Sequence, residues 1–118
     1  MPKILYYAHS MKIYGTEREQ EELDMIQAAF PQDVIYSPNR PFIQNHKDPM
    51  KACLDVILDM DTLVFSLEKR HVSSGVLLEV KHAQKHNIPV FVLQYGNVIE
   101  FSGAFRKVTR NKKSFWTV

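Results

Sequence analysis

Apolar and polar positions along the chain separate into short continuous runs and longer periodic segments. Four short runs are rich in β-branched and aromatic residues and end in polar or turn-forming residues, which predicts strands. They lie at residues 3–8, 33–36, 61–67 and 89–93. The third run is apolar almost throughout, which is typical of a strand covered on both faces of a parallel sheet. Residues 98–101 are a candidate edge strand.

Three segments between these runs have apolar residues at helical spacing, and each begins with a helix start signal. Thr16 precedes Glu19 by three positions, the spacing of a capping box, and Asp48 stands before a proline. The third segment opens at Ser73-Ser74, and Asn87 is its expected stop. The expected buried positions are Leu23, Ile26 and Phe30 in the first helix, Met50, Cys53 or Leu54, Ile57 and Met60 in the second, and Val76, Val80 and Ala83 in the third.

The alternation of strands and helices predicts an α/β fold. It is typical of a small doubly wound parallel sheet, Rossmann- or flavodoxin-like, with four to five strands, right-handed crossovers and helices on both faces. Residues 37–41, which contain two prolines, and residues 68–72 are expected to be loops. The 118 residues fit one domain spanning residues 1–118, without a repeat or an internal linker.

Composition adds a local charge asymmetry to this picture. The net charge is +2, but residues 106–118 carry five Lys and Arg. Residues 1–105 contain ten basic and thirteen acidic residues, so their net charge is −3. We therefore expect a basic C-terminal tail, which is either a solvated terminus or a nucleic-acid contact. The apolar runs are strand-sized and the N-terminus does not resemble a signal peptide, so we expect a cytoplasmic protein without a membrane role.

Cysteine and histidine usage excludes two further classes of site. Cys53 is the only cysteine, which rules out an internal disulfide framework and a cysteine-based zinc cluster. His82 and His86 have a spacing that can hold a metal on one helical face, but their helix offers no third obvious ligand, which favours exposed histidines. We expect no metal and no organic cofactor.

Three segments that are distant in sequence are predicted to meet at the carboxyl edge of the sheet: residues 9–10, 66–74 and 94–97. In the second of them, Ser73, Ser74 and Gly75 lie at a helix N-terminus, where free N–H groups favour an anion such as phosphate. Glu79 lies one turn further on and can reach back toward that N-terminus. The alternative reading is a serine helix cap followed by a solvated glutamate.

Other residues at this edge have two readings each. His9 ends a strand, where it could protonate a leaving base or be an ordinary loop residue. Tyr7 and Tyr14 could stack on a base or belong to the core and its rim. Lys12 and Arg18 could add to a phosphate clamp near Ser10, although Arg18 equally fits the exposed charges of the first helix.

Residues 73–83, SSGVLLEVKHA, are followed by NIPV at 87–90. This pattern resembles the G-x-x-x-E-x-x-x-A…G-K-P-V signature of the nucleoside 2-deoxyribosyltransferase superfamily. The resemblance implies that Glu79 is a nucleophile that attacks the anomeric carbon of deoxyribose. It also implies a site residue from the C-terminal region of a neighbouring subunit, for which Asn97 and Ser102 are the candidates, and hence a homodimer.

The opening segment YYAHS at 6–10 is similar to that of the 2′-deoxynucleoside 5′-phosphate N-hydrolase branch of this superfamily, whose serine there binds the 5′-phosphate. The similarity implies phosphate binding by Ser10. Transferases of free nucleosides usually carry an aspartate two residues before the signature glycine, whereas the monophosphate branch carries a phosphate-binding serine, and this chain has Ser73. The resemblance therefore favours a nucleoside monophosphate as the substrate.

One position departs from the family pattern. The family commonly carries a carboxylate on the second helix, and Cys53 stands there in this chain. Asp55 is two residues away, which turns a helix by about 200° and directs it away from a site that Cys53 faces.

The sequence thus predicts cleavage of the N-glycosidic bond of 2′-deoxynucleoside 5′-monophosphates, or deoxyribosyl transfer, with Glu79 and His9 as catalytic residues. Tyr7, Ser10, Ser73, Ser74, Gly75 and Asn97 are the expected substrate-binding residues. The alternative is a non-catalytic nucleotide-binding or regulatory module that retains the fold and the phosphate pocket but lacks the second carboxylate.

Overall fold

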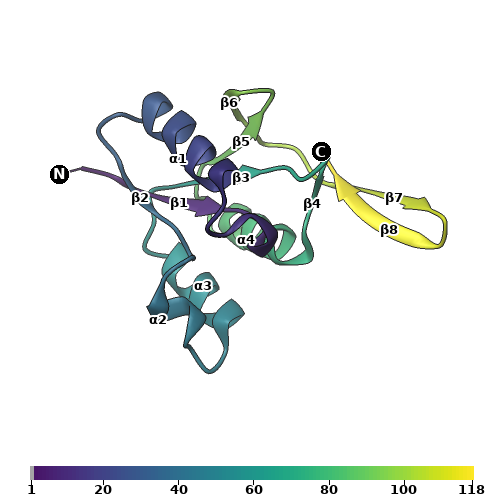
Figure 1. The fold of residues 1–118 in the computed structure, drawn as a ribbon, viewed down its shortest axis with the longest axis horizontal. Helices are drawn as coiled ribbons and strands as arrows, with labels where there is room; N and C mark the ends of the chain where they lie inside the picture. The colour runs from purple at the N-terminus through teal and green to yellow at the C-terminus, as the bar shows by residue number, and fades with distance from the viewer. Residues whose placement is uncertain (1) are drawn as a thin grey trace.

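The computed structural model describes residues 2–118, which form a five-stranded sheet flanked by helices and a smaller three-stranded sheet (Figure 1). The strands are β1 (Ile4–Ala8), β2 (Val34–Tyr36), β3 (Thr62–Ser66), β4 (His71–Val72), β5 (Val90–Gln94), β6 (Asn97–Glu100), β7 (Arg106–Arg110) and β8 (Lys113–Thr117). The helices are α1 (Glu17–Ala29), α2 (Pro41–Gln44), α3 (Pro49–Ile57) and α4 (Ser74–Lys85), and a 3₁₀ turn, η1, spans Met11–Ile13.

The larger sheet has the strand order β2-β1-β3-β5-β6. Its first four strands are parallel, and β6 pairs antiparallel with β5 at the edge. This order confirms the predicted doubly wound α/β fold, including the edge strand near residues 98–101. The chain moves from β1 outward to β2 and then returns to β3 on the other side of β1. The crossovers therefore reverse direction between β1 and β3, the position where folds of this kind open a crevice at the carboxyl ends of their strands.

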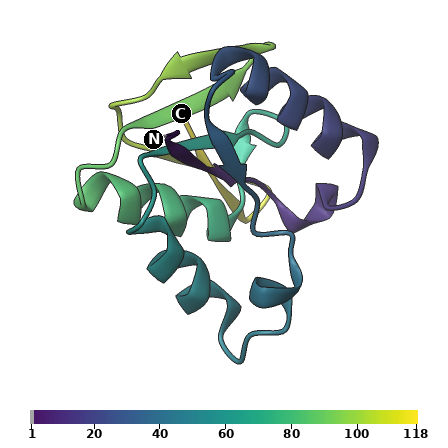
Figure 2. The same ribbon diagram turned by 90° about the vertical axis from the view of Figure 1, so that its left-hand side faces the viewer.

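Alternate side chains of the central strands enter two separate cores. Leu5 and Tyr7 of β1 pack with Ile26 of α1 on one face of the sheet. Tyr6 and Ala8 of the same strand face the opposite core, which α3 and α4 cover. Figure 2 shows α1 on one side of the sheet and α3 and α4 on the other. Helices on both faces explain why β3 is buried along its whole length.

The helix start signals act as predicted at all three positions. Thr16, Asp48 and Ser73 are N-cap residues whose side chains accept backbone N–H groups of α1, α3 and α4. Asn87, the expected stop, has a φ of 60°, the left-handed conformation that commonly ends a helix. In the capping box, however, the Glu19 carboxylate accepts the N–H of Gly15 and not that of Thr16.

Two segments that were expected to be irregular contain regular structure. The proline-containing loop ends in α2, because Pro41 occupies its first turn, where a missing N–H is tolerated. The basic segment at 106–118, expected as a tail, forms the hairpin of β7 and β8, and β8 pairs with β4 inside the segment expected to be a loop. Short strands whose pairing partners lie far away in sequence have no strong periodicity of their own, which explains why they were not predicted. In residues 2–118 no helix is long and apolar enough to cross a membrane.

Candidate functional site

A cavity of about 520 Å³ lies beside the carboxyl end of β1, between η1, α2, α3 and the N-terminal turn of α4. It is on the face of the sheet that α3 and α4 cover, at the reversal between β1 and β3. The predicted residues that line it are His9, Ser10, Ser73, Ser74, Gly75 and Glu79. Tyr14, Lys12 and Cys53 also line it. The fold thus brings together six of the eight predicted site residues in one hollow.

Glu79 is a buried carboxyl group at this cavity, with 4% of its surface exposed. Tyr6 of β1 donates its hydroxyl hydrogen bond to Glu79 Oε2, and the Cys53 thiol of α3 is a second hydrogen-bonding neighbour. Burial disfavours the charged form and raises the pKa of Glu79 to about 7, although the hydrogen bonds from Tyr6 and Cys53 oppose the shift. A carboxyl group of this kind changes its protonation state near neutral pH, which is unusual for a residue with a purely structural role.

The neighbours of Glu79 are themselves held in the protonated state. Burial, followed by the nearby charge of Glu79, raises the pKa of the Tyr6 hydroxyl far above its ordinary value. Burial likewise raises the pKa of the Cys53 thiol to about 11. Both groups therefore remain hydrogen-bond donors at neutral pH and can stabilise an ionised Glu79. The Tyr6 ring is fixed in turn by Tyr36, whose ring stacks on it with centroids 6.0 Å apart.

The N-terminal turn of α4 also lines the cavity. The Ser73 hydroxyl accepts the N–H of Val76 at 3.3 Å, so it caps the helix while its own hydrogen remains free to donate. The N–H groups of Ser74 and Gly75 belong to the first turn, where a helix provides no backbone acceptor. Glu79 lies four residues further, about 6 Å along the helix axis. The arrangement therefore offers an anion site and a carboxyl group one helical turn apart.

Gly75 permits a close approach between two helices at this point. A Cβ at position 75 would lie 3.3 Å from Cε of Met50 on α3, so a side chain here would push that methionine. Both residues line the cavity. The glycine thus lets α3 pack closely against the N-terminal turn of α4.

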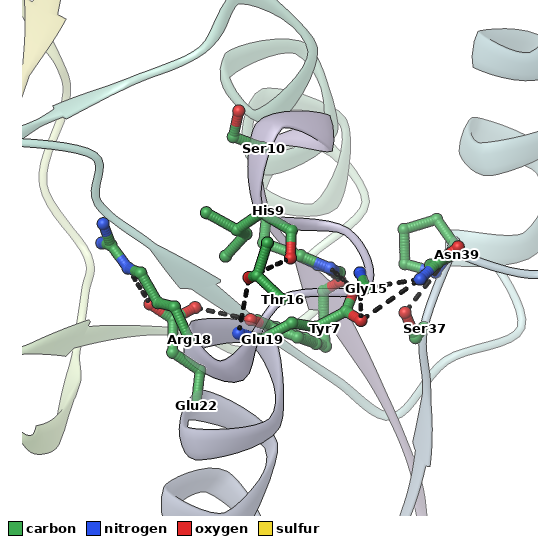
Figure 3. Close-up of polar contacts among 12 residues, drawn as sticks. Tyr7, His9, Ser10, Gly15, Thr16, Arg18, Glu19, Glu22, Ser37 and Asn39 are labelled. Atoms are coloured by element: carbon green, nitrogen blue, oxygen red, sulfur yellow. Dashed lines mark hydrogen bonds and ion pairs between the residues drawn. The ribbon is translucent and has the colours of Figure 1, made fainter.

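His9 lies in a buried polar network and has no exposed side-chain surface (Figure 3). Its Nδ1 lies 3.0 Å from the carbonyl oxygen of Tyr7, and its Nε2 lies 2.7 Å from Glu19 Oε2. Since a carbonyl oxygen only accepts, Nδ1 donates to it, and Nε2 donates to the carboxylate when the ring is protonated. Both ring nitrogens are occupied, so this geometry favours a positioning role for His9 over the predicted proton transfer to a leaving base.

Glu19 connects three segments around the end of β1. Besides His9, its carboxylate accepts the N–H of Gly15 at 3.0 Å and the side-chain amide of Asn39 at 3.2 Å (Figure 3). Burial opposes ionisation of Glu19, but the hydrogen bonds from His9, Gly15 and Asn39 outweigh it and lower its pKa. An ionised Glu19 therefore holds together the segment that carries Ser10, the start of α1 and the loop before α2.

The other two predicted substrate-binding residues lie elsewhere. Tyr7 is fully buried on the opposite face of the sheet, where its hydroxyl donates to Glu22 at 2.5 Å and its ring stacks on His9 at 3.7 Å. It cannot stack on a base in this arrangement. Asn97 begins β6, is exposed and does not line the cavity. Among the tyrosines, Tyr14 lines the cavity.

Arg18 and Asp55 also have clear positions. Arg18 donates from Nε to Glu22 at 3.1 Å and from Nη2 to the carbonyl oxygen of Leu67, so it connects α1 to the segment after β3 and leaves the Glu79 cavity without its charge. Asp55 is exposed and pairs with Lys51 at 2.9 Å, whereas Cys53 lines the cavity, as the helical geometry predicts.

Sequence reasoning missed Tyr6 and Glu19 as partners of the site. The available signal for Glu19 was its spacing: Glu19, Glu22 and Ile26 share one helical face, and all three are buried. Two glutamates buried on the apolar face of a helix cost free energy unless they accept hydrogen bonds, and His9 and Tyr7 are the donors. Tyr6 had no comparable signal, because its hydroxyl meets Glu79 only once α4 packs across β1. In the described residues no group of three His, Cys, Asp or Glu side chains could hold a metal ion.

Comparison with known proteins supports the fold alone. No protein-family model matches the chain, and no curated protein matches it significantly. Among solved structures, it is similar to a conserved protein from Enterococcus faecalis V583, with a TM-score of 0.57 and 21% sequence identity. The match covers 78% of this chain and 63% of the other, so this chain spans less than two thirds of that protein.

Proposed function

We propose that this protein cleaves the N-glycosidic bond of 2′-deoxynucleoside 5′-monophosphates, with Glu79 as the nucleophile. The observation that carries the proposal is the position of Glu79. It is a buried carboxyl group with a pKa of about 7, at a cavity that is also lined by a helix N-terminus with two serines. The resemblance of residues 73–83 to the nucleoside 2-deoxyribosyltransferase signature supports the same role.

The reaction proceeds by double displacement. A Glu79 carboxylate oxygen bonds to C1′ of the sugar while the C1′–N bond breaks and its electron pair leaves with the base. Water then attacks C1′, which releases deoxyribose 5-phosphate and regenerates the carboxylate, and the proton that the water loses is taken up by the departed base. If a second base replaces water, the outcome is deoxyribosyl transfer. Tyr6 and Cys53 orient Glu79, and Ser10, Ser73 and the α4 N-terminus bind the phosphate.

The direct test is incubation of the protein with each of the four deoxynucleoside monophosphates and chromatographic detection of free base. We expect Glu79→Ala to lower the rate by roughly 1000-fold or more, the size of effect that follows loss of a nucleophile. Asp55→Ala is the matched control, because it removes an exposed carboxylate on the far side of α3. Absence of base release from every substrate, or equal rates for the wild type and Glu79→Ala, would exclude the proposal.

The phosphate part of the proposal has its own test. Ser10→Ala should raise KM for a monophosphate and leave the KM for the corresponding nucleoside unchanged, since only the monophosphate carries the group that the serine binds. A similar rise for both substrates would contradict phosphate binding by Ser10. The expected homodimer stays a prediction, which analytical ultracentrifugation would test.

A second candidate is a non-catalytic nucleotide-binding module, and Cys53 is the observation that favours it. Its thiol faces the cavity where the resembling family commonly has a carboxylate, and Asp55 faces solvent instead. Calorimetric titration with monophosphates distinguishes the candidates. Heat of binding without base release supports the module, and base release supports the enzyme.

A further inference from the structure

A second cavity, of about 560 Å³, lies between the β7–β8 hairpin and the turns that follow β3 and β5. It shares no lining residue with the Glu79 cavity. Figure 1 shows the hairpin projecting from the end of the sheet, beside β4. Four basic residues line the cavity, together with the rings of Tyr95 and Phe115.

The side-chain charges of this second cavity are all positive. Lys69, Arg70, Arg106 and Arg110 line it, and no Asp or Glu does. In residues 2–118, none of these four side chains forms an ion pair. Gathering like charges without a counter-charge costs free energy, so the arrangement suits an anionic ligand that supplies the missing charge.

Two of these cations lie in a strained turn. Glu68 and His71 exchange backbone hydrogen bonds of 2.7 and 3.0 Å, and the residues between them, Lys69 and Arg70, have φ values of 48° and 73°. Asn-Gly is the favoured pair for such a turn, because side chains other than Asn, Asp and Gly are disfavoured at positive φ. Consecutive basic residues here cost stability that a more usual turn sequence would avoid. Strain of this kind is typical of functional positions.

Successive side chains along each strand of the hairpin point to opposite faces. Arg106, Val108 and Arg110 of β7 line the cavity, whereas Lys107 and Thr109 point to the other face. On β8, Phe115 lines the cavity and contacts His71, with ring centroids 5.1 Å apart. The cavity face of the hairpin therefore alternates cationic and apolar side chains, and the opposite face packs on the core through Trp116.

The basic surface continues beyond this cavity. An adjoining hollow of about 260 Å³ shares Lys69, Arg70, Gln94 and Tyr95 with it and ends at the Arg18–Glu22 ion pair of α1, whose charges cancel. Tyr95 is 77% exposed at the junction of the two hollows and is held at a φ of 53°. Unpaired cations therefore extend from the hairpin to Lys69 and Arg70, which border both hollows, with the ring of Tyr95 exposed between them.

The two joined hollows form a basic trough lined by Lys69, Arg70, Arg106 and Arg110. We infer that this basic trough binds single-stranded nucleic acid, with phosphates on these four cationic groups and a base stacked on Tyr95. Two joined hollows suit a chain of phosphates better than the single phosphate of a mononucleotide. Exposed aromatic rings within a cationic groove are the combination that recognises unpaired bases, whose faces are free for stacking. The trough extends the nucleic-acid contact expected from residues 106–118 to Lys69, Arg70 and Tyr95.

The test is fluorescence anisotropy of a labelled twenty-nucleotide oligothymidylate, titrated with the full chain at several salt concentrations. If four cations each neutralise a phosphate, the plot of log K against log salt concentration has a slope of about −3. We expect Arg106→Gln/Arg110→Gln to weaken binding by tenfold or more and to make the slope shallower by about 1.4. The control is Lys107→Gln/Lys85→Gln, which removes the same charge from exposed positions outside the trough and should change affinity less than threefold.

Substitutions of Tyr95 distinguish base stacking from simple charge attraction as the source of binding. Tyr95→Ala should weaken binding by about tenfold, whereas Tyr95→Phe should bind like the wild type because it keeps the ring. The inference is overturned if the oligonucleotide does not bind at 50 mM salt, or if the control pair weakens binding as much as the arginine pair. It is also overturned if Tyr95→Ala has no effect, or if duplex DNA or polyglutamate binds more tightly than the oligonucleotide. Circular dichroism melting confirms that each variant is folded.

Discussion

Tyr6 and Glu79 are 73 positions apart in the chain and share a buried hydrogen bond, with the tyrosine hydroxyl as donor. The bond joins the first strand of the sheet to the last helix, and it ends on the carboxyl group that we propose as a nucleophile. Burial raises the pKa of Glu79, and the hydrogen bond from Tyr6 opposes that rise. The predictions below concern two buried glutamates, Glu79 and Glu19, and the groups that donate hydrogen bonds to them.

The first prediction concerns the pH dependence of base release. A nucleophilic carboxyl group must be ionised, and the pKa of Glu79 is raised to about 7 by burial. The rate should therefore rise about tenfold per pH unit below that value and level off above it. Initial rates measured from pH 5 to pH 9 with saturating monophosphate test this. A profile that is flat between pH 5 and pH 7 would show that the reaction does not depend on this ionisation.

The second prediction concerns stability. The pKa of Glu79 is higher in the folded protein than its ordinary value of 4.5, so the folded state binds more protons and the wild type loses stability as the pH rises from about 4.5 through 7. Glu79→Gln has no charge to bury. Its free energy of unfolding should exceed that of the wild type by up to about 3 kcal/mol at pH 8 and should match it more closely at pH 4.5. Urea denaturation at the two pH values measures the difference, and an equal difference at both would contradict the prediction.

Tyr6→Phe is the third prediction. The change removes the hydroxyl donor but keeps the ring that stacks on Tyr36. A hydrogen bond to a charged group contributes about 1.5–3 kcal/mol, so the pKa of Glu79 should rise by roughly one unit or more and base release at pH 7 should fall by about fivefold or more.

Tyr7→Phe is the matched control for this change. It also removes a buried tyrosine hydroxyl from β1, but that hydroxyl contacts Glu22 on the other face of the sheet. It should lower stability without moving the acidic limb of the pH profile. If both variants shift the limb alike, the Tyr6 hydroxyl does not act through Glu79.

The fourth prediction concerns Glu19. Burial opposes its ionisation, but hydrogen bonds from His9, Gly15 and Asn39 outweigh burial and lower its pKa. An ionised Glu19 therefore contributes stability above the ordinary pKa of 4.5, and this contribution is lost as the pH falls through the lowered value. Glu19→Gln should lower the free energy of unfolding by about 2 kcal/mol at pH 7 and by less at pH 3.

Glu21→Gln on the exposed side of the same helix is the reference for this variant and should change stability by less than about 0.5 kcal/mol. The contrast between the two variants can be measured by chemical denaturation. A loss for Glu19→Gln that is the same at pH 7 and pH 3 would mean that the network does not depend on the glutamate charge.

Hydrophobic pattern and capping residues alone were sufficient to predict the main elements and the doubly wound fold. Period-two and period-3.6 patterns report which face of an element is buried, and Thr16, Asp48 and Ser73 mark helix starts through contacts with residues close by in sequence. Once the strands were known to be parallel, their carboxyl ends had to converge. That geometry also predicted the placement of Ser10, Ser73 and Glu79 around one hollow. Helical periodicity separately predicted the opposite orientations of Cys53 and Asp55.

Only the tertiary structure decided which polar groups meet. Tyr6 and Tyr7 are adjacent and chemically identical, yet strand alternation directs one to Glu79 and the other to Glu22. The pKa of Glu79 is a property of its burial and its neighbours, which lie on β1 and α3, and no local pattern encodes them. The hairpin that gathers Arg106 and Arg110 beside Lys69 and Arg70 depends on the pairing of β8 with β4. Local sequence determines elements because their energetics are local, whereas sites form between elements and depend on packing over long sequence separations.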